Sequence, residues 1–226
     1  VRQLKAVLAA HDPGSKAKQE GMFSAILPAA AVSLFTQWLC ALKSAVGSPV
    51  ARADPPAGWA AGASFGYSAS VWRRASVDVF RAIGDPRNLL TSPPLEAARL
   101  NGNGPTARRL AYFNLHGIAD GPNWYGQREP DGPISSQPEY PVALRPQDVP
   151  NSGRAPQIVF SEACYGAHIE GKTPESALCL KFLDCGAQAV IGSTRISYGS
   201  MSAPLLGADL LGQSFWEILL QGVPAG

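Results

Sequence analysis

The chain has 226 residues, of which 46% are hydrophobic, so it can bury one substantial core and needs no second domain. Nineteen basic and seventeen acidic residues give a formal net charge of +2, and like charges are dispersed, so neither a nucleic acid nor an anionic membrane surface is expected as a partner. Four cysteines are too few and too scattered for a disulfide scaffold, and no C-x-x-C pair suggests structural zinc.

Residues 1–57 are expected to form a helical segment and a linker that pack on the main domain, residues 58–226. The stretch Met22 to Leu42 has no charged residue across 21 positions, about the length that spans a hydrocarbon core. Pro28 and several polar side chains interrupt it, and alanines dilute it, which favours a buried helix over a membrane span. Because the chain begins at Val1 and ends soon after a helical pattern, we expect a fragment whose main domain is truncated at its C-terminal end.

Between Ser44 and Gly66 the composition changes to Gly, Pro, Ala and Ser without periodicity, which predicts a loop or linker. Ser70 then stands at an N-cap position ahead of an amphipathic helix that Gly84 and Pro86 end. One face of that helix is predicted to carry Trp72, Ala75, Val79 and Ile83. After it, N-L-L-T-S-P-P fits a short strand closed by two prolines.

Two apolar runs each deliver one reactive side chain. A-Y-F-N-L leads into His116 and Gly117, and Q-I-V-F-S-E-A leads into Cys164, Tyr165 and Gly166. Both runs are short and rich in β-branched or aromatic residues, which predicts two strands buried on both faces of a parallel sheet. The carboxyl ends of such strands are where open α/β sheets place their sites. Since a thiol needs a neighbouring base to become a good nucleophile, the two residues form a candidate Cys/His dyad.

At these residues the sequence resembles the caspase-like cysteine peptidases of clan CD, and F-N-L-H-G with S-E-A-C-Y-G-A is most similar to the gingipain type. The resemblance extends from about Gly66 to Gly222 as an order of elements. It implies an α/β fold, a three-layer α/β/α sandwich with a mainly parallel central sheet. It also implies a cysteine-type endopeptidase that hydrolyses a peptide or protein substrate through a thioester intermediate.

The same resemblance implies a role for each residue of the site. Cys164 would attack the scissile carbonyl, His116 would act as acid and base, and the backbone N–H groups of Gly117 and Cys164 would hold the oxyanion. Glycine lets the backbone approach a substrate closely, and one oxyanion donor is worth about 3–4 kcal/mol. Glu162, two residues before the sulfur, stands where some members of the clan carry Gln or Asp, and it is the remaining catalytic candidate.

By resemblance, the stretch from Ser193 to Gly199 would pair with the backbone of the substrate. The candidate substrate-binding residues are Ser193, Thr194, Arg195, Ile196, Tyr198, Asp120 and Trp124. Several related peptidases select a basic residue with a carboxylate in the pocket, which Asp120, Glu129 or Asp131 would supply here. Acids in a polar loop are more often solvated, so no residue preference follows from the sequence.

The connection from Ile118 to Pro156 is too long for an ordinary loop, which is typical of a functional or disordered segment, or of a surface insertion. Within it, W-Y-G-Q-R-E-P-D-G suggests a wall beside the histidine, and E-Y-P-V-A-L an extended piece near the cleft. After the cysteine, Thr173 is predicted to cap a helix that Gly186 ends. Its apolar stripe is predicted to be Ser176, Cys179, Leu180 and Leu183.

The last elements are a strand, A-V-I-G-S-T-R-I-S-Y-G, and a helix that stops at Gly222. One face of the helix is predicted to carry Leu211, Phe215, Ile218 and Leu219.

Other sites are less well supported by the sequence. G-N-G-P-T-A fits a dinucleotide pattern but precedes a strand, so it is predicted to be a turn. His168 lies four residues after Cys164, but further strong ligands are missing, so neither a metal nor a cofactor is expected. A serine nucleophile is poorly supported, since I-G-S-T-R lacks the second glycine of a G-x-S-x-G elbow. The alternative function is a catalytically inactive caspase-like domain that binds peptides or proteins as a scaffold, and the Cys–His geometry would distinguish the two.

Overall fold

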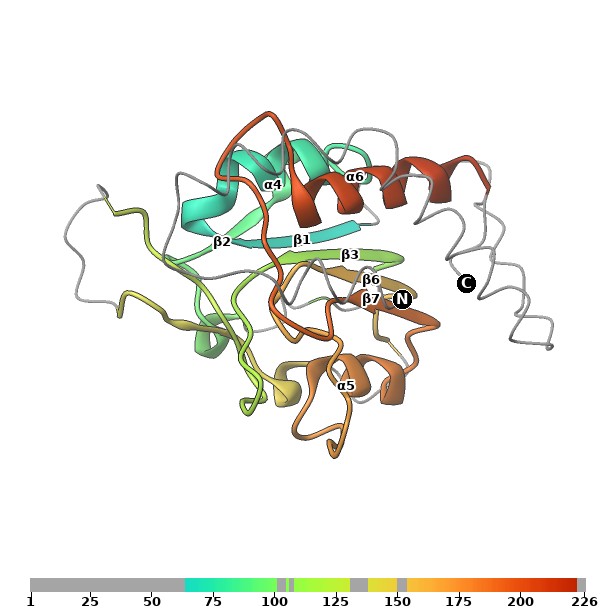
Figure 1. Ribbon diagram of the computed structural model, residues 1–226. Helices are drawn as coiled ribbons and strands as arrows, with labels where there is room; N and C mark the ends of the chain where they lie inside the picture. The colour runs from blue at the N-terminus through green and yellow to red at the C-terminus, as the bar shows by residue number, and fades with distance from the viewer. Residues whose placement is uncertain (1–63, 101–104, 106–107, 131–137, 150–153, 223–226) are drawn as a thin grey trace. The chain divides into compact units, whose positions relative to one another are not determined.

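The computed structural model describes residues 64–100, 105, 108–130, 138–149 and 154–222, which belong to the larger of two units of the chain, Asp54–Ala225. A parallel sheet in the order β2-β1-β3-β6-β7 forms the centre (Figure 1). Its strands are β1 (Ser64–Ala69), β2 (Leu90–Ser92), β3 (Leu110–Asn114), β6 (Ile158–Ser161) and β7 (Ala189–Gly192).

The three central strands owe their position to side chains that are buried on both faces. Every residue of β1, β3 and β6 is buried, as expected of parallel strands covered by helices on either side. Strand β7 lies at one edge of the sheet, pairs only with β6 there, and keeps all of its residues half-buried. The predicted strands before the histidine and the cysteine, and the short strand before the two prolines, are therefore confirmed.

Helices cover both faces of this sheet. Helix α4 (Arg73–Phe80) and helix α6 (Gly207–Leu220) contact each other on one face, whereas helix α5 (Leu178–Asp184) lies on the other (Figure 1). On the α6 face, Phe160 packs against Phe215 and Trp216. The α/β/α sandwich with a mainly parallel sheet is therefore confirmed.

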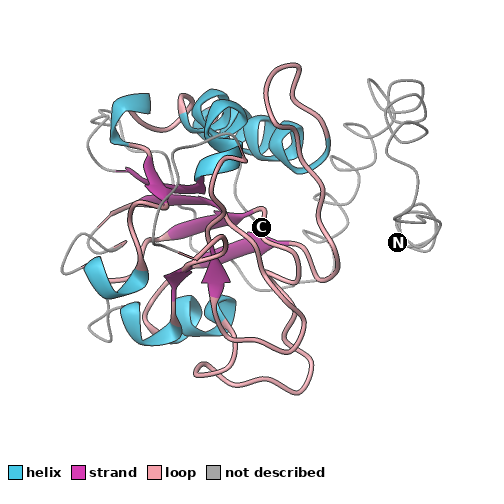
Figure 2. Ribbon diagram, turned by 90° about the vertical axis from the view of Figure 1, so that its left-hand side faces the viewer, coloured by secondary structure: helices cyan, strands magenta, loops and turns pink. Residues whose placement is uncertain are grey.

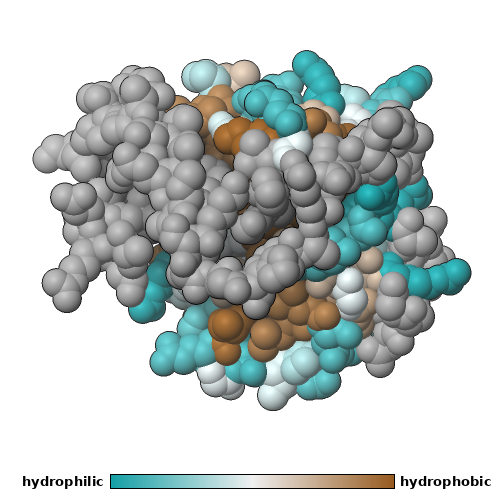
Figure 3. Space-filling view, turned by 90° about the vertical axis from the view of Figure 1, so that its right-hand side faces the viewer, coloured by the Kyte–Doolittle hydropathy of each residue, from teal (hydrophilic) through white to brown (hydrophobic). Residues whose placement is uncertain are grey.

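The strand order changes direction between β1 and β3, and this is where the chain places its short extra elements. Strands β4 (Trp124–Tyr125) and β5 (Val142–Leu144) form a small antiparallel ladder after β3. Figure 2 faces the side on which the sheet strands end, where long loops gather. Figure 3 shows the opposite side, on part of which apolar side chains gather. The 3₁₀ turns are η1 (Ser70–Trp72), η2 (Pro86–Asn88), η3 (Ala97–Arg99) and η4 (Pro146–Asp148).

Two predictions for the first part of the domain are wrong. The predicted linker ends too late, because S-F-G-Y-S-A forms the fully buried strand β1. The side chain of Ser70 does not cap a helix. Its hydroxyl donates to the carbonyl of Pro93, and a 3₁₀ turn precedes α4. The apolar face is otherwise correct, since Ala75, Val79 and Ile83 are buried.

The predictions for the later helices need smaller corrections. Helix α5 starts at Leu178 rather than after Thr173, because Ser176 forms a turn in which its backbone N–H donates to the Thr173 carbonyl. Leu183 is 44% exposed, and Leu178 and Phe182 fill the core instead. Cys179 is buried as predicted, and Gly186 follows the helix with φ at 101°.

In helix α6, Phe215 and Leu219 are buried as predicted, but Leu211 is 39% exposed and Trp216 takes its place in the core. Gly222 follows this helix with φ at 87°.

Several predictions fall outside the described residues. The N-terminal segment 1–57, including Met22 to Leu42, lies there, as do most of G-N-G-P-T-A and Asp131. Within the described ranges, the helices are all too short or too polar to cross a bilayer.

Candidate active site

The two predicted reactive residues follow neighbouring strands. Strands β3 and β6 are hydrogen-bonded in register from Leu110–Ile158 to Phe113–Ser161, and His116 and Cys164 lie just beyond their carboxyl ends. The N–H of Glu162 donates to the carbonyl of Phe113 at 2.8 Å, which continues this pairing past the strand. Both motifs therefore lie side by side where the parallel strands of the sheet end.

Their backbones touch as well. A Cβ added at Gly117 would clash with the carbonyl oxygen of Cys164, so only glycine allows the two motifs to approach this closely. In the described part of the chain, neither the N–H of Gly117 nor that of Cys164 has a hydrogen-bond acceptor. Both are therefore free to donate to a developing oxyanion, as predicted for them.

The imidazole of His116 is enclosed by side chains from outside its own strand. Its ring packs on Trp72 at 4.3 Å between ring centroids and lies edge-on to Tyr140 at 5.4 Å. Its backbone exchanges hydrogen bonds with Tyr125 at 2.8 and 2.9 Å, so β4 forms the wall beside the histidine that W-Y-G-Q suggested. Burial lowers the pKa of His116, which outweighs the hydrogen bond to Gln127, and the ring is neutral at pH 7.

Gln127 determines which imidazole nitrogen is basic. Its Oε1 lies 2.8 Å from Nε2 of His116, and its Nε2 donates to the Tyr140 hydroxyl at 3.3 Å. With the amide so oriented, Nε2 of His116 carries the proton and Nδ1 keeps its lone pair. Nothing in the sequence singled out Gln127, because its contact with His116 depends on the bend between β3 and β4.

Cys164 lies on a tight turn at the end of β6. Tyr165 has a φ of 56°, a left-handed conformation that costs a non-glycine residue roughly 1–2 kcal/mol. The half-buried sulfur accepts from the N–H of Ser197 at 3.3 Å and donates to the Ser197 carbonyl at 3.4 Å. No hydrogen bond joins it to His116 within the described residues.

The segment after β7, predicted to bind substrate, runs along this cysteine turn. The carbonyl of Arg195 accepts from the N–H of Tyr165 at 2.8 Å, and that of Ser193 accepts from Ala167 at 2.9 Å. Thr194 is exposed, and Ile196 and Tyr198 are 45% and 44% exposed, so these side chains lie partly in solvent.

The remaining predicted substrate-binding residues lie elsewhere. Trp124 is 4% exposed and contacts Phe113 and Phe182, which makes it mainly a core residue. Asp120 and Glu129 are exposed in the long connection.

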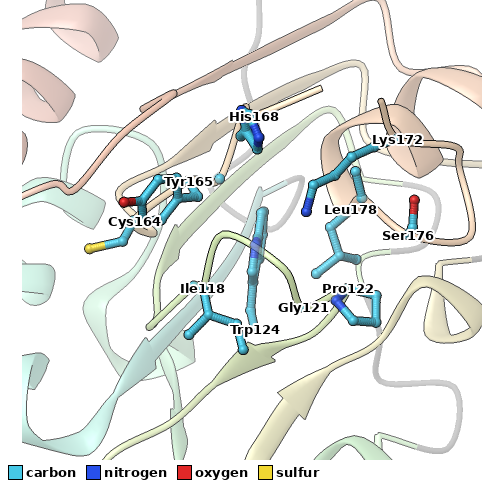
Figure 4. A pocket seen from close by; sticks show the side chains of 13 residues that line it. Ile118, Gly121, Pro122, Trp124, Cys164, Tyr165, His168, Lys172, Ser176 and Leu178 are labelled. Carbon is cyan, nitrogen blue, oxygen red and sulfur yellow. The ribbon is translucent and has the colours of Figure 1, made fainter. Parts of the chain in front are cut away.

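A small pocket lies beside the turn that carries Cys164, on the side away from its sulfur. Trp124, Tyr165, His168 and Leu178 line it, and Lys172 points into it while donating to the Ala119 carbonyl (Figure 4). The sulfur of Cys164 points away from this pocket, so the pocket does not present a ligand to the thiol (Figure 4).

Glu162 takes a position that the sequence did not suggest. It is 6% exposed, accepts from the Tyr112 hydroxyl at 2.8 Å and faces Asp209 of helix α6. Its carboxyl group is therefore buried against β3 and α6. Asp209 carried no motif that would have linked it to the cysteine, and Ser197 was predicted only as part of the substrate-pairing stretch from Ser193 to Gly199.

Comparison with known proteins adds no assignment: no protein-family model matches the chain, and neither the curated proteins nor the solved structures give a significant match.

Proposed function

We propose that this protein is a cysteine-type endopeptidase, related to the caspase-like peptidases, that uses Cys164 and His116. The observation that carries the proposal is the pair of neighbouring parallel strands β3 and β6, beyond whose carboxyl ends lie a half-buried imidazole and a thiol, with the two backbones in contact at Gly117. The residues available at this edge match the parts that acyl transfer needs: a nucleophile, a base and two oxyanion donors.

In the proposed reaction, Nδ1 of His116 takes the thiol proton and the sulfur of Cys164 attacks the scissile carbonyl. The N–H groups of Gly117 and Cys164 hold the oxyanion until the C–N bond breaks, and the imidazolium gives its proton to the leaving amine. A thioester remains on the sulfur. Water, deprotonated by the same imidazole, hydrolyses the thioester and releases the acid and the thiol.

The histidine suits both roles. Its lowered pKa keeps it a base at neutral pH, and the hydrogen bond to Gln127 directs the free lone pair to Nδ1. Because the sulfur bonds to Ser197 in the absence of a substrate, attack requires a rotation of the thiol toward the imidazole. Catalytic hydrogen bonds often form only in the substrate complex.

The alternative is a caspase-like domain that binds peptides without cleaving them. The favouring observation is that thiol and imidazole each bond to another group, Ser197 and Gln127. Strand β7 also has a free edge in the described sheet, to which an extended peptide could add.

The deciding experiment is labelling with a peptidyl acyloxymethyl ketone library, followed by mass spectrometry of the modified residue. We expect label on Cys164, loss of label in Cys164→Ala and His116→Ala, and dependence on the terminal residue of the peptide. Cys179→Ala is the matched control, because burial raises the pKa of that thiol and it should not react. Label spread over the other cysteines, or none, would favour the non-cleaving domain.

A further inference from the structure

Two buried carboxyl groups meet beside the cysteine turn. Asp209, the third residue of helix α6, is fully buried, and Glu162, two residues before Cys164, is 6% exposed. Their side chains are in hydrogen-bonding contact. Of the described residues, the only other titratable group facing the pair is the Tyr112 hydroxyl from β3, and α4 contributes Ser76. In this part of the chain, therefore, no cation balances the two acids.

The hydrogen-bond partners determine where the proton lies. Oδ1 of Asp209 accepts a hydrogen bond from the side-chain amide of Asn114 at 3.3 Å, and Oδ2 accepts one from the N–H of Ser200. Both partners are donors, so Asp209 accepts on both of its oxygens. Glu162 accepts from Tyr112 on Oε1, but its Oε2 has no donor among the described residues. A proton on Oε2 lets Glu162 donate to Asp209 and satisfies every oxygen. The start of α6 also favours the anion at Asp209.

Burial supports this arrangement. It raises the pKa of Asp209 to about 6 and that of Glu162 well above its ordinary value, with the charge of Asp209 adding to the effect on Glu162. Two carboxyl groups in contact cannot both ionise cheaply, so one shared proton is retained at neutral pH.

The pair is linked to the thiol through the segment Ser197–Ser200. At one end, Asp209 accepts from Ser200, and the N–H of Ala208 donates to the Tyr198 carbonyl at 2.8 Å. At the other end, the backbone of Ser197 holds the sulfur of Cys164. This segment therefore spans from the start of α6 to the thiol.

We propose that Glu162 and Asp209 act together as positioning residues: by sharing one proton they hold the segment Ser197–Ser200 on helix α6, and the segment orients the sulfur of Cys164. The consequence for catalysis rests on the proposed function, but the positioning itself does not. Loss of the shared proton at high pH places two carboxylates face to face, so the segment loosens.

The test is the protection of the Ser197 and Ser200 amides against hydrogen exchange, measured by NMR on the full chain from pH 6 to 9 and corrected for the intrinsic rates. In the wild type, protection should fall as pH rises. In Glu162→Gln, the amide donates to Asp209 at every pH and its oxygen still accepts from Tyr112, so protection should not change with pH.

Two further variants disrupt the contact between Asp209 and Ser200. In Asp209→Asn, only one side-chain atom can still accept a hydrogen bond, whereas Asn114 and Ser200 both donate to this position. Protection of the Ser200 amide should therefore fall about tenfold. Gly199→Ala places a Cβ against Oδ2 of Asp209 from an exposed loop position, so it tests the same contact if Asp209→Asn does not fold. Glu217→Gln, on the exposed side of α6, is the matched control and should leave protection within about twofold.

A second readout separates this inference from the proposed function. With a cleavable peptide, the alkaline limb of the kcat/KM profile should move to higher pH in Glu162→Gln, an effect that a merely structural role would not produce. Protection that is independent of pH in the wild type, or unchanged in Asp209→Asn and Gly199→Ala, overturns the positioning role. Protection that behaves as expected in a protein without turnover refutes the proposed function and leaves the positioning role intact.

Discussion

His116 shows how one side chain acquires its chemistry from residues far along the chain. Trp72 comes from the turn after β1, and Tyr140 lies beyond the predicted wall. These rings bury the imidazole in part, and Gln127 forms a hydrogen bond with its Nε2. The neutral, singly oriented base is therefore a product of packing, and the sequence reveals only that a histidine is present.

We expect Gln127→Ala to lower kcat/KM by about tenfold to a hundredfold, part of the roughly 10²–10⁴ that general acid–base catalysis contributes. The reason is that the imidazole would lose its preferred tautomer. Gln127→Glu places a carboxylate beside Nε2 and raises the pKa of His116, so the acid limb of the pH profile should move to higher pH.

Rates measured from pH 5 to 9 with one peptide substrate check both expectations. Gln188→Ala, at an exposed position before β7, serves as the control and should match the wild type. An acid limb that stays in place in Gln127→Glu would show that the imidazole does not act as the base.

At the scale of elements, helix α6 joins the core to the cysteine turn. Trp216 is fully buried against Phe160 and Phe215, and its indole N–H has no hydrogen-bond partner among the described residues. The ring stabilises the fold by its apolar area, since its one polar atom is unsatisfied.

Trp216→Ala should therefore lower the free energy of unfolding by about 3–5 kcal/mol, because it leaves a large cavity between α6 and the sheet. Trp216→Phe keeps most of the packing and removes the unsatisfied donor, so its cost should be well below that of the alanine variant. Urea unfolding followed by circular dichroism measures both. Equal losses in the two variants would mean that the indole N–H has a partner.

Periodicity predicted the types of elements better than their limits. The strands before His116 and Cys164 were predictable because they are continuous apolar runs. Strand β1 was not, because S-F-G-Y-S-A is poor in the β-branched residues that mark a strand, and its burial comes from the helices on either side. Helix α5 starts late because Ser176 bonds back to Thr173, a local competition that an apolar stripe does not reveal.

The residues of the candidate site also differ in whether the sequence could predict them. The placement of Cys164, His116 and Gly117 beyond the ends of two neighbouring strands was predictable from two short motifs, since each motif follows a continuous apolar run. The place of Asp209 was not, because it lies 45 residues after Cys164 and meets Glu162 only when α6 packs on the sheet. The difference 209 − 164 = 45 exceeds the range of any local pattern. Buried polar contacts across elements are therefore the part of a site that one sequence conceals.

For the whole molecule, the buried groups predict how stability depends on pH. The pKa of Asp209 rises from 3.8 to about 6 and that of Glu162 rises as well, so the folded state binds these protons more tightly than the unfolded chain. The contribution of Asp209 to stability is complete below about pH 4 and is lost as pH rises through about 6, and that of Glu162 falls as pH rises above the ordinary range of a glutamate. His116 has the opposite sign: its pKa is lowered, so its contribution is present above about pH 6.5 and is lost as pH falls.

We therefore expect the free energy of unfolding to decrease between pH 4.5 and 7.5 with a slope of at most about 1.4 kcal/mol per pH unit for each proton, reduced at the acid end by His116. Glu162→Gln cannot ionise, so this variant should be at least as stable as the wild type at pH 7.5 and should show a shallower slope. Urea unfolding at four pH values measures the slopes, with Glu217→Gln as an exposed control. A wild-type slope equal to that of Glu162→Gln, with both falling in parallel, would show that Glu162 is ionised in the folded protein and that its contact with Asp209 does not hold a proton.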